Sequence, residues 1–159
     1  MNFDRRAFRN ALGCFATGVT VVTTVTDTGD PVGLTANSFS SVSLDPPLVL
    51  FCLDRSSQNL AAFRASGRFA VNVLGDDQRD LSVRFSTTIG DRWDGVAWEI
   101  WETGAPVLNG CLAVLDCETE AFHEGGDHII IVGRVKRLEA ATDGKPLLYF
   151  RGNYATVDE

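Results

Sequence analysis

Short runs of β-branched and other apolar residues, separated by turn residues, recur along this chain and limit what it can fold into. Val19–Thr26, Leu48–Leu53 and Phe69–Leu74 each have the length and composition of a β-strand. The segment DTGD after the first run is typical of a turn, because Gly29 is free to adopt a positive φ. Many short strands with only short helices between them favour a compact, mainly antiparallel β-barrel.

The two longest predicted strands form a hairpin. Leu112–Phe122 and His128–Glu139 flank the segment HEGGD, whose paired glycines are typical of a tight turn. Leu48–Leu53 is apolar on both faces and follows two prolines, which favour an extended chain, so it is expected to be a central strand. Two further strands are expected over Val32–Ala36 and Ala97–Trp101.

Three short helices accompany these strands. The first is predicted over Asp4–Thr17, where Asp4 is a capping residue and Gly18 suits the end of the helix. Its apolar face carries Phe8, Leu12 and Phe15. The second is expected to begin near Asp54–Ser57 and to end at Gly67. The third is expected to cover Asp76–Phe85. A polar loop over Ser86–Gly95, which holds Trp93, and an apolar, aromatic tail over Pro146–Tyr154 complete the chain.

Composition narrows the class of protein. The 159 residues are most simply one domain (residues 1–159), and 45% hydrophobic with 22% charged residues is typical of a soluble globular protein. A net charge of −7 argues against nucleic acid or an anionic membrane as a partner, because both call for basic patches. The sequence holds no 18-residue apolar run, and its first residues lack a signal-peptide core, so we expect a cytoplasmic location.

Cysteine and histidine usage gives no sign of a disulfide framework or a metal site. The four cysteines form no C-x-x-C pair, and we expect reduced, mostly buried thiols. Only two histidines are present and no ligand spacing is tight, so no metal is expected. The cysteines are Cys14, Cys52, Cys111 and Cys117.

Small hydroxyl and amide residues lie on both sides of the apolar run at 48–53. Such residues let backbone N–H groups approach a ligand closely and add donors without bulk. Two serines after the run also lie at a predicted helix N-terminus, which suits a phosphate, and Arg55 adds charge. A polar loop with an ordinary helix cap fits the same residues. The residues are Thr35, Asn37, Ser38, Ser40 and Ser41 before the run, and Ser56 and Ser57 after it.

Four segments, in this order and spacing, resemble the flavin reductase family: FRNALGCFATGVTVVTT, GLTANSFSSVSLDPPLVLFCLDRSSQNL, FAVNVL and GDHIIIVGRV. The resemblance extends from about Phe8 to Tyr154. It implies an antiparallel, Greek-key-like split β-barrel that binds FMN or FAD and works as a homodimer. It also implies that NADH or NADPH is oxidised and that reduced flavin is supplied to a partner flavin-dependent monooxygenase.

The resemblance also implies where flavin is bound. It places one group of residues along the isoalloxazine ring, where hydride transfer to N5 leaves negative charge near N1 and O2. A fixed donor at that edge is worth about 2.7–4 kcal/mol in a well-formed site. The residues expected along the ring are Thr35, Ala36, Asn37 and Ser38. The residues expected at the ribityl chain and phosphate are Cys52, Asp54, Ser56 and Ser57. This part of the site is completed by Ser40, Ser41, Arg55 and Asn59. A turn residue at Asn37, a packing role at Cys52 and a simple cap at Ser57 are the alternatives.

Residues further along the chain match the family pattern as well. Arg84 and Phe85 match an Arg-Phe step, where Phe85 either shields the flavin or fills the core. Tyr149, Arg151 and Tyr154 resemble an aromatic, basic C-terminus that reaches the flavin or a dimer interface. The family's Gly-Gly-Tyr is replaced here by Gly152-Asn153-Tyr154, which leaves a backbone contact at Asn153 in doubt. For Trp93 and Trp98, core packing is preferred over a place beside the nicotinamide.

His128 is the predicted catalytic residue. It follows Gly126 and Asp127, as the family histidine beside the nicotinamide does, and it would orient the carboxamide or exclude water, because hydride transfer needs no base. His123 is expected to be a surface residue. No G-x-G-x-x-G opens a helix, so the nicotinamide would stack directly on the flavin, and no basic cluster marks a 2′-phosphate site, which favours NADH.

Two other functions fit the same fold. One is an electron carrier with tightly held FMN, and the other is a non-catalytic barrel that senses or stores a ligand. Excess free flavin separates the reductase from the carrier, because only a reductase turns over faster with it.

Overall fold

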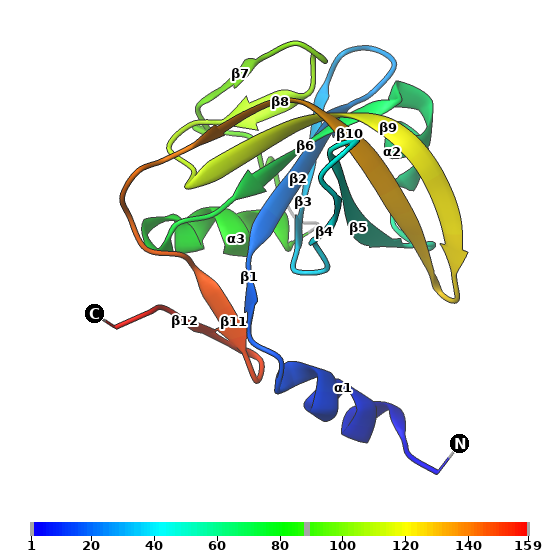
Figure 1. Ribbon diagram of the computed structural model, residues 1–159, viewed down its shortest axis with the longest axis vertical. Helices are drawn as coiled ribbons and strands as arrows, with labels where there is room; N and C mark the ends of the chain where they lie inside the picture. The colour runs from blue at the N-terminus through cyan, green and yellow to red at the C-terminus, as the bar shows by residue number, and fades with distance from the viewer. Residues whose placement is uncertain (1, 88–89, 159) are drawn as a thin grey trace.

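The computed structural model describes residues 2–87 and 90–158, and its main element is one seven-stranded antiparallel sheet. The strands of this sheet are β2 (Thr20–Val25), β3 (Pro31–Ala36), β4 (Ser40–Ser43), β5 (Leu48–Asp54), β6 (Arg68–Val73), β9 (Ala113–Gly125) and β10 (His128–Ala140). Their order across the sheet is β3–β2–β6–β9–β10–β5–β4 (Figure 1).

The two outer strands of this sheet are neighbours in the sequence. Only residues 37–39 connect β3 to β4, and a link this short holds the two ends close together because each residue spans at most about 3.6 Å. A sheet whose outer strands must meet has to curl into a barrel. Hydrogen bonds connect the strands in turn from β3 across the sheet to β4. Among the described residues β3 and β4 do not pair with each other, so the barrel is split between these two strands. The predicted mainly β, antiparallel split-barrel fold is confirmed.

Smaller elements surround the barrel. The two minor sheets are β1 (Thr17–Gly18) with β11 (Leu148–Phe150) and β12 (Asn153–Ala155), and β7 (Trp98–Ile100) with β8 (Pro106–Leu108). The helices are α1 (Arg5–Gly13), α2 (Leu60–Ser66) and α3 (Arg79–Phe85), and a 3₁₀ turn, η1 (Asp76–Gln78), comes before α3.

The barrel interior is filled by aromatic and branched side chains from facing strands. Phe51 of β5 contacts Phe63 of α2 and Phe69 of β6 edge-on, with ring centroids 5.4 and 5.0 Å apart. All three are fully buried, as are Ile129 and Ile131 of β10. This packing fixes the positions of the strand ends from which the site is built.

Most predicted elements are present within a residue or two. The strands at 19–26, 32–36, 48–53 and 69–74 are confirmed, and so is the hairpin of β9 and β10. Gly29 has the expected positive φ, and Gly67 ends α2 as expected, in the left-handed conformation. The predicted helix over Asp76–Phe85 is divided into η1 and α3. Residues 88 and 89 of the predicted polar loop lie outside the described residues.

The first helix differs from its prediction. Asp4 caps it, accepting a hydrogen bond from the N–H of Ala7 at 2.7 Å, but the helix ends at Gly13 rather than continuing to Thr17. Residues 17–18 instead form β1, which pairs with β11. As Figure 1 shows, α1 projects away from the barrel, and Phe8, Leu12 and Phe15 are 52%, 58% and 77% exposed. Within residues 2–87 and 90–158, the apolar face of α1 is therefore left largely exposed.

The thiols are free, as expected, but they are not mostly buried. Cys14 is exposed because it follows α1, which lies outside the barrel. Cys52 and Cys111 are partly buried, and Cys117 is buried. Burial raises the pKa of Cys117 to about 12 and that of Cys111 to about 11, so both remain protonated at neutral pH. Across residues 2–87 and 90–158, no helix is long and apolar enough to span a membrane, and the cytoplasmic location stays a prediction.

Candidate functional site

The link between β3 and β4 is braced by the side chain of Ser38. Its Oγ accepts a hydrogen bond from the N–H of Cys52 at 2.9 Å and donates one to the Cys52 carbonyl at 3.1 Å. These two bonds tie the link to β5, which is 14 residues away in the sequence. The Ser38 hydroxyl is therefore used to hold the link in place, and Asn37, which precedes it, is exposed on a fixed backbone.

A second set of hydrogen bonds holds the end of β3 from the other side. Thr35 Oγ1 donates to the carbonyl of Ser82 in α3 at 2.7 Å, and the Ser82 hydroxyl is 2.6 Å from the hydroxyl of Tyr154 in β12. The guanidinium of Arg79 lies over the Tyr154 ring at 4.8 Å. Ala36 is buried, and its carbonyl accepts from Thr20 Oγ1 at 2.7 Å. The hydroxyls of Thr35 and Tyr154 are therefore used to hold the end of β3 in place.

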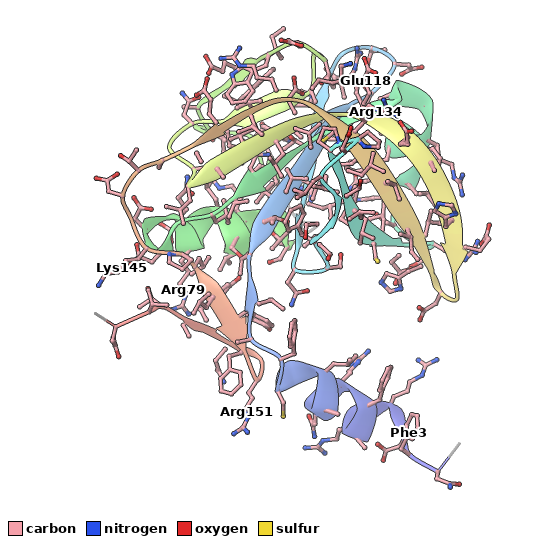
Figure 2. The ribbon with its side chains drawn as sticks, viewed as in Figure 1. Phe3, Arg79, Glu118, Arg134, Lys145 and Arg151 are labelled. Carbon is pink, nitrogen blue, oxygen red and sulfur yellow. The ribbon has the colours of Figure 1, made fainter. Side chains whose placement is uncertain are left out.

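A cavity of about 930 Å³ lies between this link, α1 and the β11–β12 hairpin; we call it the α1 cavity. Asn37 and Ser38 form one wall, while Tyr149 and Arg151 come from the hairpin on the other side. Figure 2 shows Arg151 beside the C-terminal end of α1, where its N–H donates to the Gly13 carbonyl at 2.8 Å. The remaining lining residues are Arg9, Asn10, Leu12, Gly13, Cys14, Phe15, Thr17 and Gly152.

The α1 cavity unites four of the predicted cofactor residues with several that the sequence did not reveal. Asn37, Ser38, Tyr149 and Arg151 were predicted to contact flavin, and more than 100 residues of sequence separate the first pair from the second. Residues of α1 and the segment after it were missed, because that segment was expected to be continuous helix. The one available signal was the run of arginines in α1, which is unusual in a chain of net charge −7.

Charge and surface chemistry in this cavity suit an anionic, aromatic ligand. Arg9 and Arg151 supply positive charge, which attracts phosphate groups. Leu12, Phe15 and Tyr149 supply apolar surface for a ring system. The volume falls within the range of cofactor sites, about 300–1,000 Å³. The residues present therefore fit a flavin.

Two more predicted cofactor residues, Asp54 and Ser56, lie with the predicted catalytic residue His128 where β5 ends beside the start of β10. Together with Asp127, which contacts His128, we call this group the β5–β10 edge. His128 is the direct partner of Asp54 across the two strands. The Asp54 carboxylate accepts from the hydroxyl and the N–H of Ser56, both at 2.7 Å. These bonds, with a smaller contribution from His128, lower the pKa of Asp54, so it is ionised at neutral pH.

His128 is held by its neighbour. Its Nδ1 lies 2.8 Å from Oδ1 of Asp127, and its side chain is 42% exposed. With Nδ1 engaged, Nε2 is the ring nitrogen left to meet a ligand. The β5–β10 edge is tied to one wall of the α1 cavity through β5, because Cys52, which Ser38 binds, lies two residues before Asp54 on that strand. The residues of the edge are not among those that line the cavity.

Arg55 and Ser57 have local partners. The Arg55 guanidinium forms an ion pair with Glu124, and its Nε donates to the Gly126 carbonyl at 2.8 Å. Ser57 Oγ accepts from the N–H of Asn59 at 3.2 Å, a turn bond outside the seven-residue helix α2, which begins at Leu60. Ser40 and Ser41 are exposed on β4, where Ser40 Oγ donates to the Ser41 carbonyl at 3.0 Å.

Phe85 and Arg84 lie away from the α1 cavity. Phe85 is 1% exposed and packs edge-on against Trp93 at 5.0 Å, so it fills a core. Arg84 is exposed and donates to the Asp94 carbonyl. Trp93 in turn contacts Trp98 with ring centroids 5.8 Å apart. This aromatic cluster stabilises the outer side of β3, where Gly33 leaves room for it.

Comparison with known proteins decides the family. Residues 12–158 match the model of the flavin reductase-like domain, which is nearly the whole chain. The chain belongs to the flavin reductase family. As the sequence predicted, it is therefore an oxidoreductase that takes flavin and a reduced nicotinamide nucleotide as reactants, in a class whose members serve partner monooxygenases.

Relatives of this flavin reductase cover the same length. FMN reductase (NADH) SmoA of Agrobacterium fabrum is 52% identical over 151 residues, 95% of this chain and 85% of that protein. HsaB of Mycobacterium tuberculosis, the reductase subunit of a flavin-dependent monooxygenase, is 45% identical over 157 residues, 98% of this chain and 83% of that protein. NADH:FAD oxidoreductase SgcE6 of Streptomyces globisporus has a TM-score of 0.92 at 36% identity, covering 100% of this chain and 96% of that chain.

Proposed function

We propose that this flavin reductase binds FMN or FAD in the α1 cavity, reduces it with NADH and releases it to a flavin-dependent monooxygenase. The observation that carries the proposal is the α1 cavity itself, in which Asn37 and Ser38 face Tyr149 and Arg151. NADH is favoured over NADPH because two similar proteins carry NADH in their names. The partner is inferred from relatives that are reductase subunits of monooxygenases.

The residues of the α1 cavity have separate roles in binding the flavin. A bound flavin supplies the hydride acceptor. Asn37 would donate a hydrogen bond to the polar edge of the ring, and Phe15 and Tyr149 would hold its apolar surface. Arg9 and Arg151 attract the phosphate groups. Ser38 and Thr35 act indirectly, because their hydroxyls hold the link that carries Asn37.

His128 serves the nicotinamide. Its Nδ1 is engaged by Asp127, which leaves Nε2 as the ring nitrogen that can hydrogen-bond to a ligand on the β5–β10 edge. We assign it to orientation of the carboxamide and exclusion of water, because hydride transfer requires no proton transfer at the donor carbon. Asp54 and Ser56 shape the same edge through their mutual hydrogen bonds.

NADH oxidation, followed at 340 nm with and without added FMN, tests the proposed function. Turnover should rise and saturate with free FMN. The His128→Ala variant should lower kcat/KM for NADH by about ten- to 100-fold, because a misplaced reactant loses the advantage of orientation. His123→Ala is the matched control, since His123 is exposed on the same hairpin. Binding of FMN without NADH oxidation would favour the electron carrier, and equal behaviour of the two variants would remove His128 from the site.

We further propose that the protein is a homodimer in which a second copy covers α1. The helix exposes Phe8 and carries Arg5 and Arg6, which lie outside the lining of the α1 cavity, whereas the whole chain has a net charge of −7. A basic, apolar arm on an acidic protein is complementary to another copy of the same chain.

Light scattering tests this dimer. The wild-type protein should have twice the 17.2 kDa mass of the chain. Phe8→Glu should shift it to the single-chain mass, because the change places a charge in the covered surface. Leu44→Glu should leave the mass unchanged, since Leu44 is 97% exposed at a different place. A wild-type protein that is monomeric at all concentrations would contradict the proposal.

A further inference from the structure

We propose that Arg55 is a positioning residue, which holds the tip of the β9–β10 hairpin and thereby the ring of His128. The inference rests on the proposed role of His128 at the nicotinamide. It replaces the sequence-based expectation that Arg55 supplies charge to a flavin phosphate. Three contacts from this one residue, all to the hairpin tip, carry the inference.

The first contact belongs to the main chain. The N–H of Arg55 donates to the carbonyl of Asp127 at 3.0 Å. It extends the β5–β10 ladder one step past the pair formed by Asp54 and His128. Because any residue supplies this N–H, the bond brings the side chain of residue 55 to the hairpin tip without depending on it.

The side chain adds two contacts that only arginine makes together. Its Nε donates to the carbonyl of Gly126 at 2.8 Å, and the guanidinium pairs with Glu124 on β9. Gly126 has a φ of +71° and forms the turn itself. A planar guanidinium reaches both acceptors with two of its N–H groups, a geometry that the single ammonium of lysine does not reproduce.

The hairpin tip in turn sets the position of His128. Gly126 and Asp127, the two residues whose carbonyls Arg55 holds, directly precede His128. The carboxylate of Asp127 then fixes Nδ1 of the His128 ring at 2.8 Å. An anion that approached Arg55 would have to displace Glu124, so the charge of Arg55 is already committed to the hairpin.

Steady-state kinetics with FMN and with riboflavin, which lacks the phosphate, separate the two roles. If Arg55 positions His128, Arg55→Ala should lower kcat/KM for NADH about tenfold or more, and by the same factor with either flavin. Arg55→Lys should not restore the rate, because the fork geometry is lost. A phosphate ligand predicts the reverse: the KM for FMN rises, the KM for riboflavin does not change, and lysine restores most of the affinity.

Glu124→Gln provides a second variant. The Glu124 side chain is 73% exposed, so its replacement should not affect folding. The positioning role predicts a smaller loss of kcat/KM for NADH in the same direction. Tighter FMN binding in this variant would overturn the inference, because it would mean that Glu124 competes with phosphate for Arg55. A wild-type protein without flavin-dependent NADH oxidation would overturn the proposed function instead, and wild-type activity in Arg55→Ala would overturn only the role of Arg55.

Discussion

Replacing Gly133 with alanine is expected to destabilise the barrel strongly. A Cβ at this position of β10 would lie 2.3 Å from Cζ of Phe69 and 3.0 Å from Cβ of Cys117. Both neighbours are fully buried, and Phe69 is further confined by its contact with Phe51 at 5.0 Å. The Phe69 ring or the strands themselves must therefore shift to make room. Overpacking of this kind costs about 1–3 kcal/mol or more, and valine should cost more than alanine.

Thermal and urea unfolding measure this effect. With about 2–4 °C for each kcal/mol in a chain of this size, Gly133→Ala should lower Tm by several degrees. Gly18→Ala is the matched control, because a Cβ at Gly18 of β1 meets nothing within 4 Å and its φ is not positive. If the two variants unfold alike, the close contact between β10 and β6 is wrong.

The amphipathic pattern of the first helix was readable from the sequence, but its surroundings were not. The spacing of Phe8 and Leu12 shows which face is apolar, and Asp4 marks the start correctly. Periodicity does not say what covers an apolar face. The helix ends at Gly13 because Thr17 and Gly18 pair with Tyr149 and Leu148, a contact across some 130 residues that local pattern cannot reveal.

Strands with a clear alternation or a long apolar run were predicted, and those without one were missed. β4 consists of Ser40–Ser43, which reads as loop, and it becomes a strand only because β5 offers it a partner. β8 is three residues long and begins with Pro106, which is typical of an edge. Both segments are strands because each pairs with a neighbouring strand, which their local sequence does not show.

The hydroxyl-rich stretch from Gly33 to Ser57 was predicted to be a binding site, but the hydrogen-bond partner of each hydroxyl depends on the folded structure. Ser38 and Thr35 use their oxygens on Cys52 and Ser82, and Ser56 uses its own on Asp54. The residue type shows that a hydroxyl can donate a hydrogen bond, but only the folded structure determines which group accepts it. The same reasoning applies to Arg55, whose ion-pair partner Glu124 is 69 positions away.

The second large effect is expected at Asn37. Its side chain is exposed in the α1 cavity, and the double hydrogen bond of Ser38 to Cys52 fixes the backbone beside it. A donor held in advance at the polar edge of a flavin stabilises the negative charge that develops there without reorganising. Asn37→Ala removes the donor, and Asn37→Asp puts a negative charge in its place.

Loss of one such donor typically lowers kcat about 100- to 1,000-fold, so we expect that range for Asn37→Ala and a further loss for Asn37→Asp. NADH oxidation at saturating FMN measures kcat, and flavin fluorescence titration shows separately whether the ligand still binds. Asn109→Asp is the matched control, because Asn109 is also exposed but lies in a different cavity, between β8 and β9. If Asn37→Asp kept wild-type kcat, Asn37 would be only a turn residue. The flavin edge would then face another wall of the α1 cavity.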